Sequence, residues 1–438
     1  MVERRSTGRV VLASLVGTSL EWYDFFLYGS AAALVFGKLF FPTFAPLTGT
    51  LLAFTTYAVG FLARPLGGIV FGHFGDRAGR KTVLVVTLML MGVATALIGV
   101  LPTYSAIGVA APILLVTLRF VQGIGLGGEW GGAVVMSIEH ASPERRGFTA
   151  SWPQVGVPAG NLLAAGVLWI MSATLPDQAF LAWGWRVPFL LSAVLVLVGL
   201  WVRLSISESP LFASVARSGG KVKLPLVEVL RRHPRELLVA MGARIGTDVA
   251  FYTFVVYVLT YVTGTLKLPR EVGLVAVLVG SAGQLVLIPM FGALSDRYGR
   301  RPVYLAGTVA AAAWAFAFFP LLSTGSRPVI ILAVAVALLT HAAMYGPQAA
   351  FVAELFATEL RYSGASMGYQ VAGIFGGALA PIIAIKLVGW TGATTSVSWY
   401  VTAMLAITAV ALLAAPETAH LPLDRRSVAE AERAYTPA

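Results

Sequence analysis

Long apolar runs alternate with short segments rich in charge and glycine along nearly the whole chain of 438 residues. A helix needs about 20 apolar residues to cross the hydrocarbon core of a bilayer, and the runs recur about every 30 to 35 residues. The sequence lacks the alternating ten-residue pattern that would indicate a β-barrel. The pattern therefore predicts an all-α integral membrane protein with about twelve membrane-spanning helices.

A polar stretch interrupts this pattern once, in the middle of the chain. Residues 205–236 are rich in basic side chains and contain the pair Gly219-Gly220, as expected of a linker. We expect three parts: an N-terminal six-helix half (1–204), a cytoplasmic linker (205–236), and a C-terminal six-helix half with a short cytoplasmic tail (237–438). The predicted spans begin near Val10, Gly49, Thr82, Pro112, Phe148, Val187, Leu237, Val272, Val303, Val329, Ser363 and Thr395.

One ten-residue segment occurs twice. The pattern G-x-x-x-D-R-x-G-R-[KR] at residues 72–81 returns at residues 292–301, 220 positions later and in register. Each copy joins two apolar runs, as a hairpin between two membrane helices does. The repeat indicates that the two halves are copies of one six-helix unit.

Composition agrees with this class: 58% of the residues are hydrophobic and only 12% are charged. The net charge of +11 is distributed as membrane topology predicts, since most Lys and Arg residues fall in segments on the side of the two termini. We therefore expect both termini in the cytoplasm and no nucleic-acid partner. The chain contains no cysteine, which excludes disulfides and thiolate metal sites.

The motifs together resemble the major facilitator superfamily and, within it, the metabolite:proton symporter family. The resemblance rests on the repeated loop, the central linker, the Glu/Arg loops after spans four and ten, and shorter motifs such as Glu21-Trp-Tyr-Asp24-Phe, Arg119-Phe-Val-Gln-Gly123 and Gly184-Trp-Arg-Val-Pro-Phe189. That family includes transporters of shikimate, 2-oxoglutarate, citrate and proline/betaine. The resemblance implies proton-coupled uptake of a small organic metabolite by alternating access in a bacterial cytoplasmic (inner) membrane.

Ionisable residues within the apolar runs are few, and burying them in hydrocarbon is unfavourable. They are Glu21, Asp24, Arg64, Arg119, Glu129, Arg244, Asp248 and His341. All but Arg64 fall on spans one, four, seven and ten, the helices that line the central cavity in the resembling superfamily. They are candidates either for transport or for buried ion pairs between helices.

Asp24 and Arg119 are our candidates for proton coupling, together with Glu21. At about 1.5 Å per residue, both come out at roughly 20 Å from the inner face, so they can meet. Burial disfavours the ionised form of Asp24, whereas a nearby arginine favours it. A proton can then be taken up and released as the balance changes. Arg64 is a candidate partner of Glu21 or Glu129.

The candidate substrate-binding residues are Arg119, Arg244, Asp248, Gln154, His341, Gln370 and Tyr28. An arginine can hold a substrate carboxylate with two parallel hydrogen bonds. Arg244 and Asp248 are spaced i, i+4, which equally suits an intrahelical salt bridge. His341 can titrate, donate to substrate or be a satisfied polar residue. Gln154 and Gln370 suit either substrate or interhelical hydrogen bonds.

The repeated loops and the loops after spans four and ten supply the expected gate. Its candidate residues are Asp76, Arg77, Arg80, Glu139, Arg146, Asp296, Arg297, Arg300, Glu354 and Arg361. The two aspartates can cap and pair with neighbouring helix ends, which would hold the inner side closed.

One further motif is not a functional match. Residues 123–128 fit a dinucleotide fingerprint but lie within a membrane span, so we interpret Gly123, Gly127 and Gly131 as helix-packing residues. We also expect close packing at Gly156 with Gly160 and at Gly373 with Gly377. We expect a transporter and no enzyme, no cofactor beyond the proton gradient, no metal, and a functional monomer with a small carboxylate as substrate. The alternatives are a proton-driven antiporter or exporter and a symporter of a zwitterion such as proline or betaine.

Overall fold

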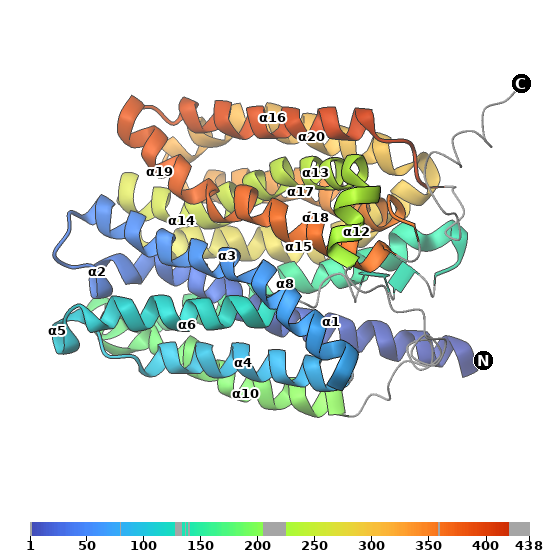
Figure 1. The fold of residues 1–438 in the computed structure, drawn as a ribbon. Helices are drawn as coiled ribbons and strands as arrows, with labels where there is room; N and C mark the ends of the chain where they lie inside the picture. Colours follow the sequence, from blue (N-terminus) through green and yellow to red (C-terminus); the bar gives the residue numbers. More distant parts are fainter. Residues whose placement is uncertain are drawn as a thin grey trace, which may run out of the picture.

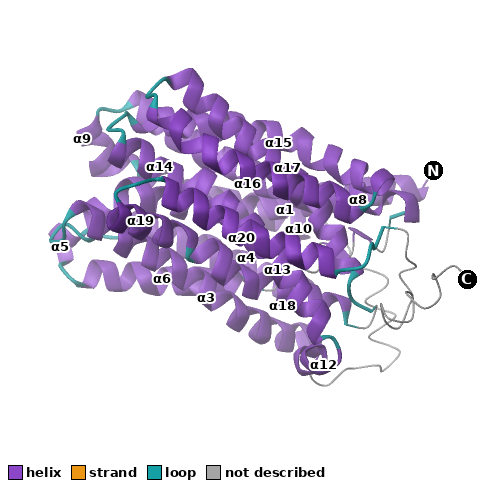
Figure 2. Ribbon diagram, turned by 90° about the horizontal axis from the view of Figure 1, so that it is seen from above, coloured by secondary structure: helices purple, strands orange, loops and turns teal. Residues whose placement is uncertain are grey.

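A computed structural model describes residues 2–78, 80–127, 134–135, 137–138, 141–204, 225–357 and 360–419. The side chains of residues 2–14, 72–78, 80–84, 202–204 and 225–227 lie outside this description. Throughout the described part, the secondary structure is helical and contains no strand (Figure 2). The helices lie side by side in a single bundle (Figure 1).

Both halves supply long helices joined by short connections. The first half contains α1 (Val2–Ala31), η1 (Ala32–Phe36), α2 (Gly37–Phe40), α3 (Pro46–Ala78), α4 (Arg80–Val100), α5 (Tyr104–Ile107), α6 (Ala110–Leu126), η2 (Pro143–Arg145), α8 (Arg146–Thr174), α9 (Asp177–Ala179), η3 (Phe180–Gly184) and α10 (Arg186–Leu204). A short helix, α12 (Pro225–Arg232), precedes the second half. The second half contains α13 (Pro234–Tyr252), η4 (Thr253–Tyr257), α14 (Val258–Thr260), η5 (Tyr261–Thr265), α15 (Arg270–Tyr298), α16 (Arg300–Ser323), α17 (Arg327–Glu354), α18 (Arg361–Gly373), η6 (Ile374–Ala378), α19 (Ala380–Thr391) and α20 (Thr395–Ala414).

These helices account for twelve spans. Nine in the described part are long and apolar enough to cross a membrane. The shorter apolar helices Val85–Val100 and Ala110–Leu126, together with α1, bring the number to twelve. The all-α fold with twelve spans is thus confirmed. The short helix α12 lies inside the segment predicted as the linker.

Several spans contain a π-helical turn, a feature that often marks functional positions. Span one continues from α1 into η1, span seven contains η4 and η5, and span eleven contains η6. Asp24 lies eight residues before η1, and Asp248 lies five residues before η4.

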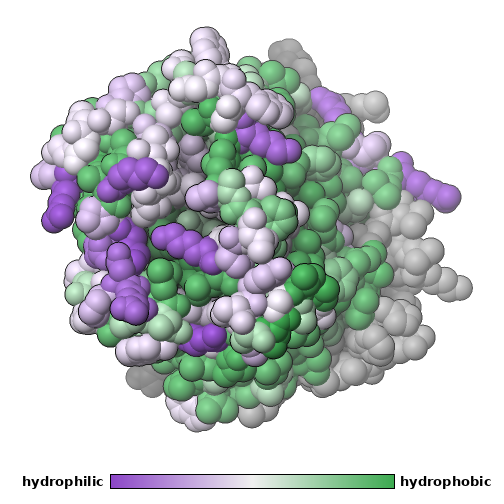
Figure 3. Space-filling view, turned by 90° about the vertical axis from the view of Figure 1, so that its left-hand side faces the viewer, coloured by the Kyte–Doolittle hydropathy of each residue, from purple (hydrophilic) through white to green (hydrophobic). Residues whose placement is uncertain are grey.

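The far end of the bundle differs from its flanks. We call the end at which α1 begins the terminal end and the opposite end the far end (Figure 1). Seen from the far end, hydrophilic residues gather on the end face, whereas hydrophobic residues cover the flanks (Figure 3). A polar end face that adjoins apolar flanks fits a protein that crosses a bilayer.

Glycines allow α3 and α6 to approach closely. A Cβ atom at Gly67 or Gly123 would overlap the backbone carbonyl of Ile124 or Gly60, and one at Gly127 would overlap that of Arg64. Gly156 and Gly160 place α8 equally close to α1, at Thr18 and Ser19. The small-residue packing predicted for Gly123, Gly127, Gly156 and Gly160 is present.

The two halves meet along α8 and α15. Asn161 on α8 donates to the Ser281 hydroxyl on α15 over 2.9 Å, and both residues are buried. Gly147 and Gly292 lie against each other nearer the terminal end, where a Cβ at either position would crowd the partner helix. A second contact between the halves brings α3 against α19 and η6.

Candidate functional site

Charged side chains gather at the centre of the bundle, on helices of both halves. Asp24, Arg64, Arg119, Arg244 and Asp248 are each exposed to 4% or less. Groups so deeply buried need specific partners, because an unpaired charge is unfavourable there. The partners therefore show what each residue is placed to do.

Asp24 and Arg119 are linked through other side chains. Within the described residues they form no direct ion pair. Arg119 donates from Nη1 to the Gln122 side-chain carbonyl, and the Gln122 amide donates to Thr95 over 2.7 Å. Thr95 interacts with the Asp24 carboxyl group, which also acts electrostatically on Arg119.

Ser192 on α10 supplies a further hydrogen bond to Asp24. Its hydroxyl donates to Asp24 Oδ1 over 2.6 Å. Asp24 is therefore held by groups from α4 and α10, while α6 carries the arginine. Glu21 lies on the same helix as Asp24 and is also buried.

Aromatic rings surround the Arg119 guanidinium. Its central carbon lies 4.6 Å from the ring centre of Phe25, 4.3 Å from that of Tyr28 and 4.8 Å from that of Tyr57. Tyr28 also shares a 2.6 Å hydrogen bond with Thr56. Stacking on aromatic faces stabilises a buried cation without occupying its N–H donors.

Arg64 lies against some of the same rings. Its central carbon is 4.2 Å from the ring centre of Phe25 and 4.4 Å from that of Phe61. The Nε and Nη2 atoms of both Arg64 and Arg119 have no hydrogen-bond partner within the described structure. These two atoms form the side edge of a guanidinium, which offers two parallel donors to a carboxylate.

The second half holds a charge pair of its own. Arg244 Nε lies 3.0 Å from Asp248 Oδ2, so the i, i+4 salt bridge is present. Arg244 also stacks on Tyr369 at 3.1 Å and donates to Gln348 over 3.4 Å. Gln348 in turn donates to the Tyr304 hydroxyl over 2.5 Å. Spans seven, nine, ten and eleven are thus tied together around Arg244.

His341 is buried on α17, where an amide and aromatic rings surround it. Its Nδ1 is 2.8 Å from the amide nitrogen of Gln284, which also donates to the Leu338 carbonyl. Its ring packs against Phe251 at 4.7 Å and Tyr345 at 5.0 Å between centres. An amide donor at Nδ1 leaves the ring proton on Nε2.

The two predicted glutamines bridge the halves. Gln154 on α8 donates to the Tyr345 carbonyl over 3.5 Å, a long hydrogen bond. Gln370 on α18 donates to the Gly127 carbonyl over 3.1 Å. Each therefore makes an interhelical contact between the first and the second half.

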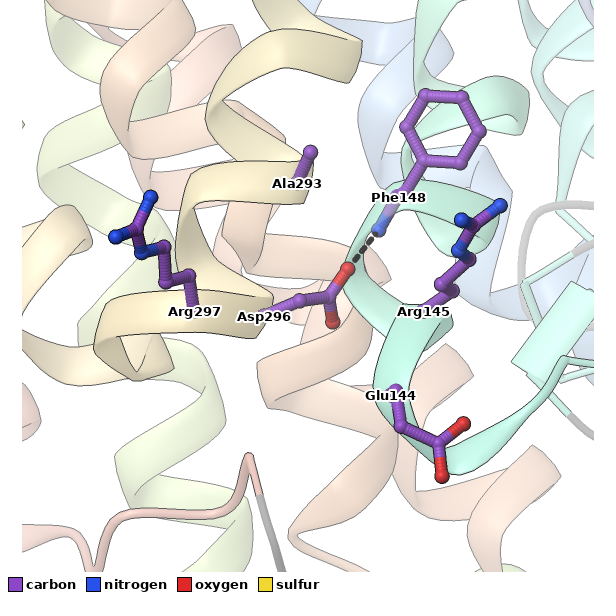
Figure 4. Close-up of a pocket in the computed structure, with 6 residues that line it drawn as sticks. All are labelled: Glu144, Arg145, Phe148, Ala293, Asp296 and Arg297. Carbon is purple, nitrogen blue, oxygen red and sulfur yellow. Dashed lines mark hydrogen bonds between the residues drawn. The ribbon is translucent and has the colours of Figure 1, made fainter.

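At the terminal end, Asp296 joins α15 to the start of α8 (Figure 4). Its two oxygens accept from the backbone N–H groups of Gly147 over 2.7 Å and Phe148 over 2.8 Å. The first N–H groups of a helix lack intrahelical partners, so this carboxylate caps a helix of the other half. A pocket of about 410 Å³ lies beside it, lined by Glu144, Arg145, Phe148, Ala293, Asp296 and Arg297.

Asp296 is held by Arg300, which lies 2.7 Å away and is fully buried. Arg300 also holds both oxygens of Glu354, at 3.1 and 3.2 Å. Thr418 donates to Glu354 over 2.7 Å. The predicted gate residues Asp296, Arg300 and Glu354 thus form one cluster.

The other predicted gate residues are placed differently or lie outside the described part. Arg361 donates to the Ala353 carbonyl over 3.2 Å, Arg146 is buried at the start of α8, and Arg297 lies over the ring of Tyr298. Glu139 and the side chains of Asp76, Arg77 and Arg80 fall outside the described residues, as does Glu129.

A second polar cluster joins the halves at the far end. Arg270 at the start of α15 lies 2.8 Å from Asp177 and donates to Ser172 at the end of α8. Ser172 donates in turn to Glu271. The guanidinium also stacks on Phe180 at 3.9 Å. Each end of the α8–α15 contact is therefore closed by a polar cluster.

Sequence reasoning missed several residues of the central site. Thr95, Ser192 and Tyr57 are neutral and stand in apolar runs like many others. Gln122 was detectable, because a buried amide three residues after Arg119 lies on the same helical face. Arg64 was noticed as a charge but was not expected among the aromatic rings.

Known families and proteins match the chain over nearly its whole length. Residues 10–223 match the family described as "Sugar (and other) transporter", and residues 247–437 match the "Major Facilitator Superfamily". The Escherichia coli "Inner membrane metabolite transport protein YhjE" is 43% identical over 95% of this chain and 96% of that protein. The Escherichia coli "Shikimate transporter" is 45% identical over 92% and 93%. The Salmonella typhimurium "Proline/betaine transporter" is 32% identical over 95% and 84%.

A solved structure shows the same fold. The proton:xylose symporter XylE aligns with a TM-score of 0.74 over 98% of this chain and 99% of that one, at 18% identity. At this identity the likeness concerns the arrangement of the helices.

Proposed function

This chain belongs to the major facilitator superfamily, and we propose that it is a proton-coupled importer of a small organic carboxylate in the bacterial cytoplasmic membrane. Its relatives named above are transporters and not enzymes. Their names include both a carboxylate, shikimate, and the zwitterions proline and betaine. The residues at the centre therefore decide which substrate class we favour.

The proposal of a carboxylate rests chiefly on the side edges of Arg64 and Arg119. Each presents Nε and Nη2 without a hydrogen-bond partner in the described structure, although each side chain is only 1% exposed. Buried donors left unsatisfied are unfavourable, so an arriving acceptor is strongly favoured. A carboxylate offers two oxygens that match such an edge. Arg244, by contrast, is already occupied by Asp248.

Asp24 is the proposed proton carrier. It is a buried carboxyl group whose contacts include two hydroxyls, Ser192 and Thr95. Hydroxyls can serve both protonation states, since they donate to a carboxylate and accept from a carboxylic acid. Protonation of Asp24 and binding of a carboxylate at Arg119 then compensate each other in charge, which links the two events.

Access would alternate between the two ends. Asp296 closes the terminal end against α8, and the Arg270 cluster closes the far end. The excess of Lys and Arg on the side of the termini supports a cytoplasmic terminal end. On this view substrate and proton enter from the far end and leave past Asp296.

A zwitterion is the second candidate. Rings of Phe25, Tyr57, Phe61 and Tyr252 pack together beside the two arginines, with centres 4.9 to 6.4 Å apart. Aromatic faces bind quaternary ammonium groups. A betaine could therefore place its carboxylate on an arginine and its ammonium group among these rings.

The test uses purified protein in vesicles. A thermal-shift screen with shikimate, 2-oxoglutarate, citrate, benzoate, proline and betaine first identifies a ligand. Uptake of that ligand is then driven by a pH gradient of one unit, acid outside. One proton per substrate sets an accumulation of about tenfold, since one pH unit corresponds to about 1.4 kcal/mol.

Asp24→Asn should abolish this accumulation and retain exchange of labelled for unlabelled substrate across the membrane. Asn keeps the shape of the carboxyl group but cannot carry the proton. Full accumulation by Asp24→Asn would exclude Asp24 as the proton carrier. A wild-type protein that binds proline or betaine and none of the organic acids would exclude the carboxylate proposal in favour of a zwitterion.

A further inference from the structure

Two hydrogen bonds lead in the same direction from Arg119 towards Asp24, and the Thr95 hydroxyl completes the connection. Arg119 donates to the Gln122 carbonyl, the Gln122 amide donates to the Thr95 hydroxyl, and Thr95 can donate to Asp24. The chain starts at a cation and ends at an acid, and both intermediates are neutral and at most 2% exposed. Aligned hydrogen bonds in a low-dielectric interior polarise and strengthen one another.

Thr95 has one proton and two acceptors within reach. Its hydroxyl lies 2.9 Å from the backbone carbonyl of Met91 and also interacts with Asp24. A hydroxyl donates only one hydrogen bond, so it cannot satisfy both acceptors at once. An ionised Asp24 attracts that proton, whereas a protonated Asp24 leaves it to Met91.

We propose that Thr95 and Gln122 are positioning residues that transmit the protonation state of Asp24 to the substrate-binding arginine, Arg119. This inference rests on the function proposed above. With Asp24 ionised, the aligned chain holds Arg119 through Nη1. With Asp24 protonated, the anionic end is lost, these hydrogen bonds weaken and Nη1 is released, so that the guanidinium can move its free Nε–Nη2 edge onto a substrate carboxylate. Substrate therefore binds after the proton.

Other titratable groups lie near these hydrogen-bonded residues and act electrostatically on the two ends, Asp24 and Arg119. Glu21 and Tyr23 on α1 act on Asp24, and Arg64 and Tyr57 on α3 act on Arg119. Tyr23 itself donates to the Pro188 carbonyl on α10 over 2.6 Å. These groups stay in place when Thr95 or Gln122 is replaced, so variants at the two positions isolate the connection.

Thr95→Val is the most conservative interruption, because it exchanges a hydroxyl for a methyl group at nearly constant volume. Gln122→Leu removes the second member of the chain. Thr95→Ser restores a hydroxyl and should restore the connection. Thr308→Val is a matched control, since Thr308 is equally buried and donates to a backbone carbonyl four residues earlier, but lies in the other half.

Three measurements on each variant separate coupling from folding and from binding. They are exchange of labelled substrate at equal pH, accumulation under a gradient of one pH unit, and substrate affinity between pH 5 and 8. The wild type and Thr308→Val should show about tenfold accumulation and an affinity that rises as the pH falls. Thr95→Val and Gln122→Leu should still exchange labelled substrate, but their accumulation should be at least fivefold lower than that of the wild type. Their substrate affinity should change less than twofold over the same pH range.

Two results would rule out the proposed connection through Thr95 and Gln122. If Thr95→Val and Gln122→Leu both accumulate substrate as the wild type does, the two residues carry no coupling. If Thr95→Ser behaves like Thr95→Val, the hydroxyl is not the element that matters. A wild type without proton-driven accumulation would instead contradict the proposed function itself.

Discussion

At the scale of single residues, the ring of Phe25 lies close to both Arg64 and Arg119. Two guanidinium groups so near each other repel, and in a buried place the repulsion is weakly screened. The aromatic faces offset part of it. An anion between the two cations would relieve the remainder, so the arrangement of the two arginines favours binding of one.

Arg119→Lys should weaken substrate binding although the positive charge remains. An ammonium group cannot present two parallel N–H donors, and it cannot stack on Tyr28 and Tyr57 as a planar guanidinium does. Loss of a charge-assisted hydrogen bond corresponds to about 1.5 to 3 kcal/mol, so we expect roughly a tenfold or larger increase in the substrate Kd. Calorimetric titration measures it.

The exposed Arg327 at the start of α17 offers the control. Arg327→Lys should leave the Kd unchanged. Equal affinities of Arg119→Lys and the wild type would show that Arg119 does not hold the carboxylate.

The sequence identified the charged residues of the centre because ionisable groups stand out in apolar runs. It did not identify the groups that connect them. Whether Asp24 contacts Arg119 directly or through Thr95 depends on helix rotations of a few tens of degrees, and hydrophobic periodicity does not define rotations so finely. Hydroxyls such as Ser192 give no signal, since serine and threonine are common in membrane helices.

At the scale of elements, α8 and α15 contact each other along most of their length. Asp296 caps the start of α8, Asn161 meets Ser281 in the middle, and Ser172 meets Arg270 near the other end. A rigid pair bonded at both ends cannot open at either one without breaking a cluster. If α8 and α15 rock against each other, the hydrogen bond in the middle lies where the two helices are displaced least.

Opposite variants should open opposite ends. Asp296→Asn removes the charge and one acceptor at the start of α8, a change worth about 1 kcal/mol or more, and should favour opening of the terminal end. Arg270→Gln removes the ion pair with Asp177 and the stacking on Phe180, and should favour opening of the far end.

The absence of native cysteine makes spin labelling direct. Exposed positions on the two halves supply the labels: Glu144→Cys with Tyr298→Cys at the terminal end, and Thr174→Cys with Thr324→Cys at the far end. Pulsed electron paramagnetic resonance should show a longer distance between the two labels of the first pair in Asp296→Asn, and between those of the second pair in Arg270→Gln. Unchanged distances together with normal transport would show that these clusters are not gates.

The repeated loop indicated Asp296 as a gate residue, whereas nothing indicated Arg270. Asp296 belongs to a ten-residue pattern that occurs twice, so its position is marked by symmetry. Arg270 follows Leu268-Pro269 in a polar connection of ordinary appearance. Its importance comes from Ser172 and Asp177, about a hundred positions earlier, and such a contact becomes visible only in the folded chain.

At the scale of the whole molecule, the repeat and the spacing of apolar runs were sufficient to predict two six-helix halves and twelve spans. This succeeds because a bilayer allows few alternatives to helices of fixed length. Packing between the halves was not predicted, since interfaces in membranes depend on shape more than on hydrophobicity.

Charge balance across the whole protein gives a prediction about voltage. One proton and one monocarboxylate enter together as a neutral pair, whereas a proton with a zwitterion carries one positive charge inward. Moving that charge is worth about 2.3 kcal/mol per 100 mV. Uptake in vesicles held at zero potential, with a pH gradient alone, should therefore persist nearly in full for a monocarboxylate. A collapse of uptake under these conditions would favour a zwitterion or additional protons.

The closure of both ends also bears on the protein at rest. A carboxyl group that became exposed to water first on one side of the membrane and then on the other, without bound substrate, would let protons leak across. Such a leak would dissipate the proton gradient of the cell. Asp24, exposed to only 4%, lies between two polar seals on the α8–α15 contact. On the function proposed above, the protein without substrate would therefore not conduct protons, and a cell could hold many copies in its membrane without dissipating the gradient.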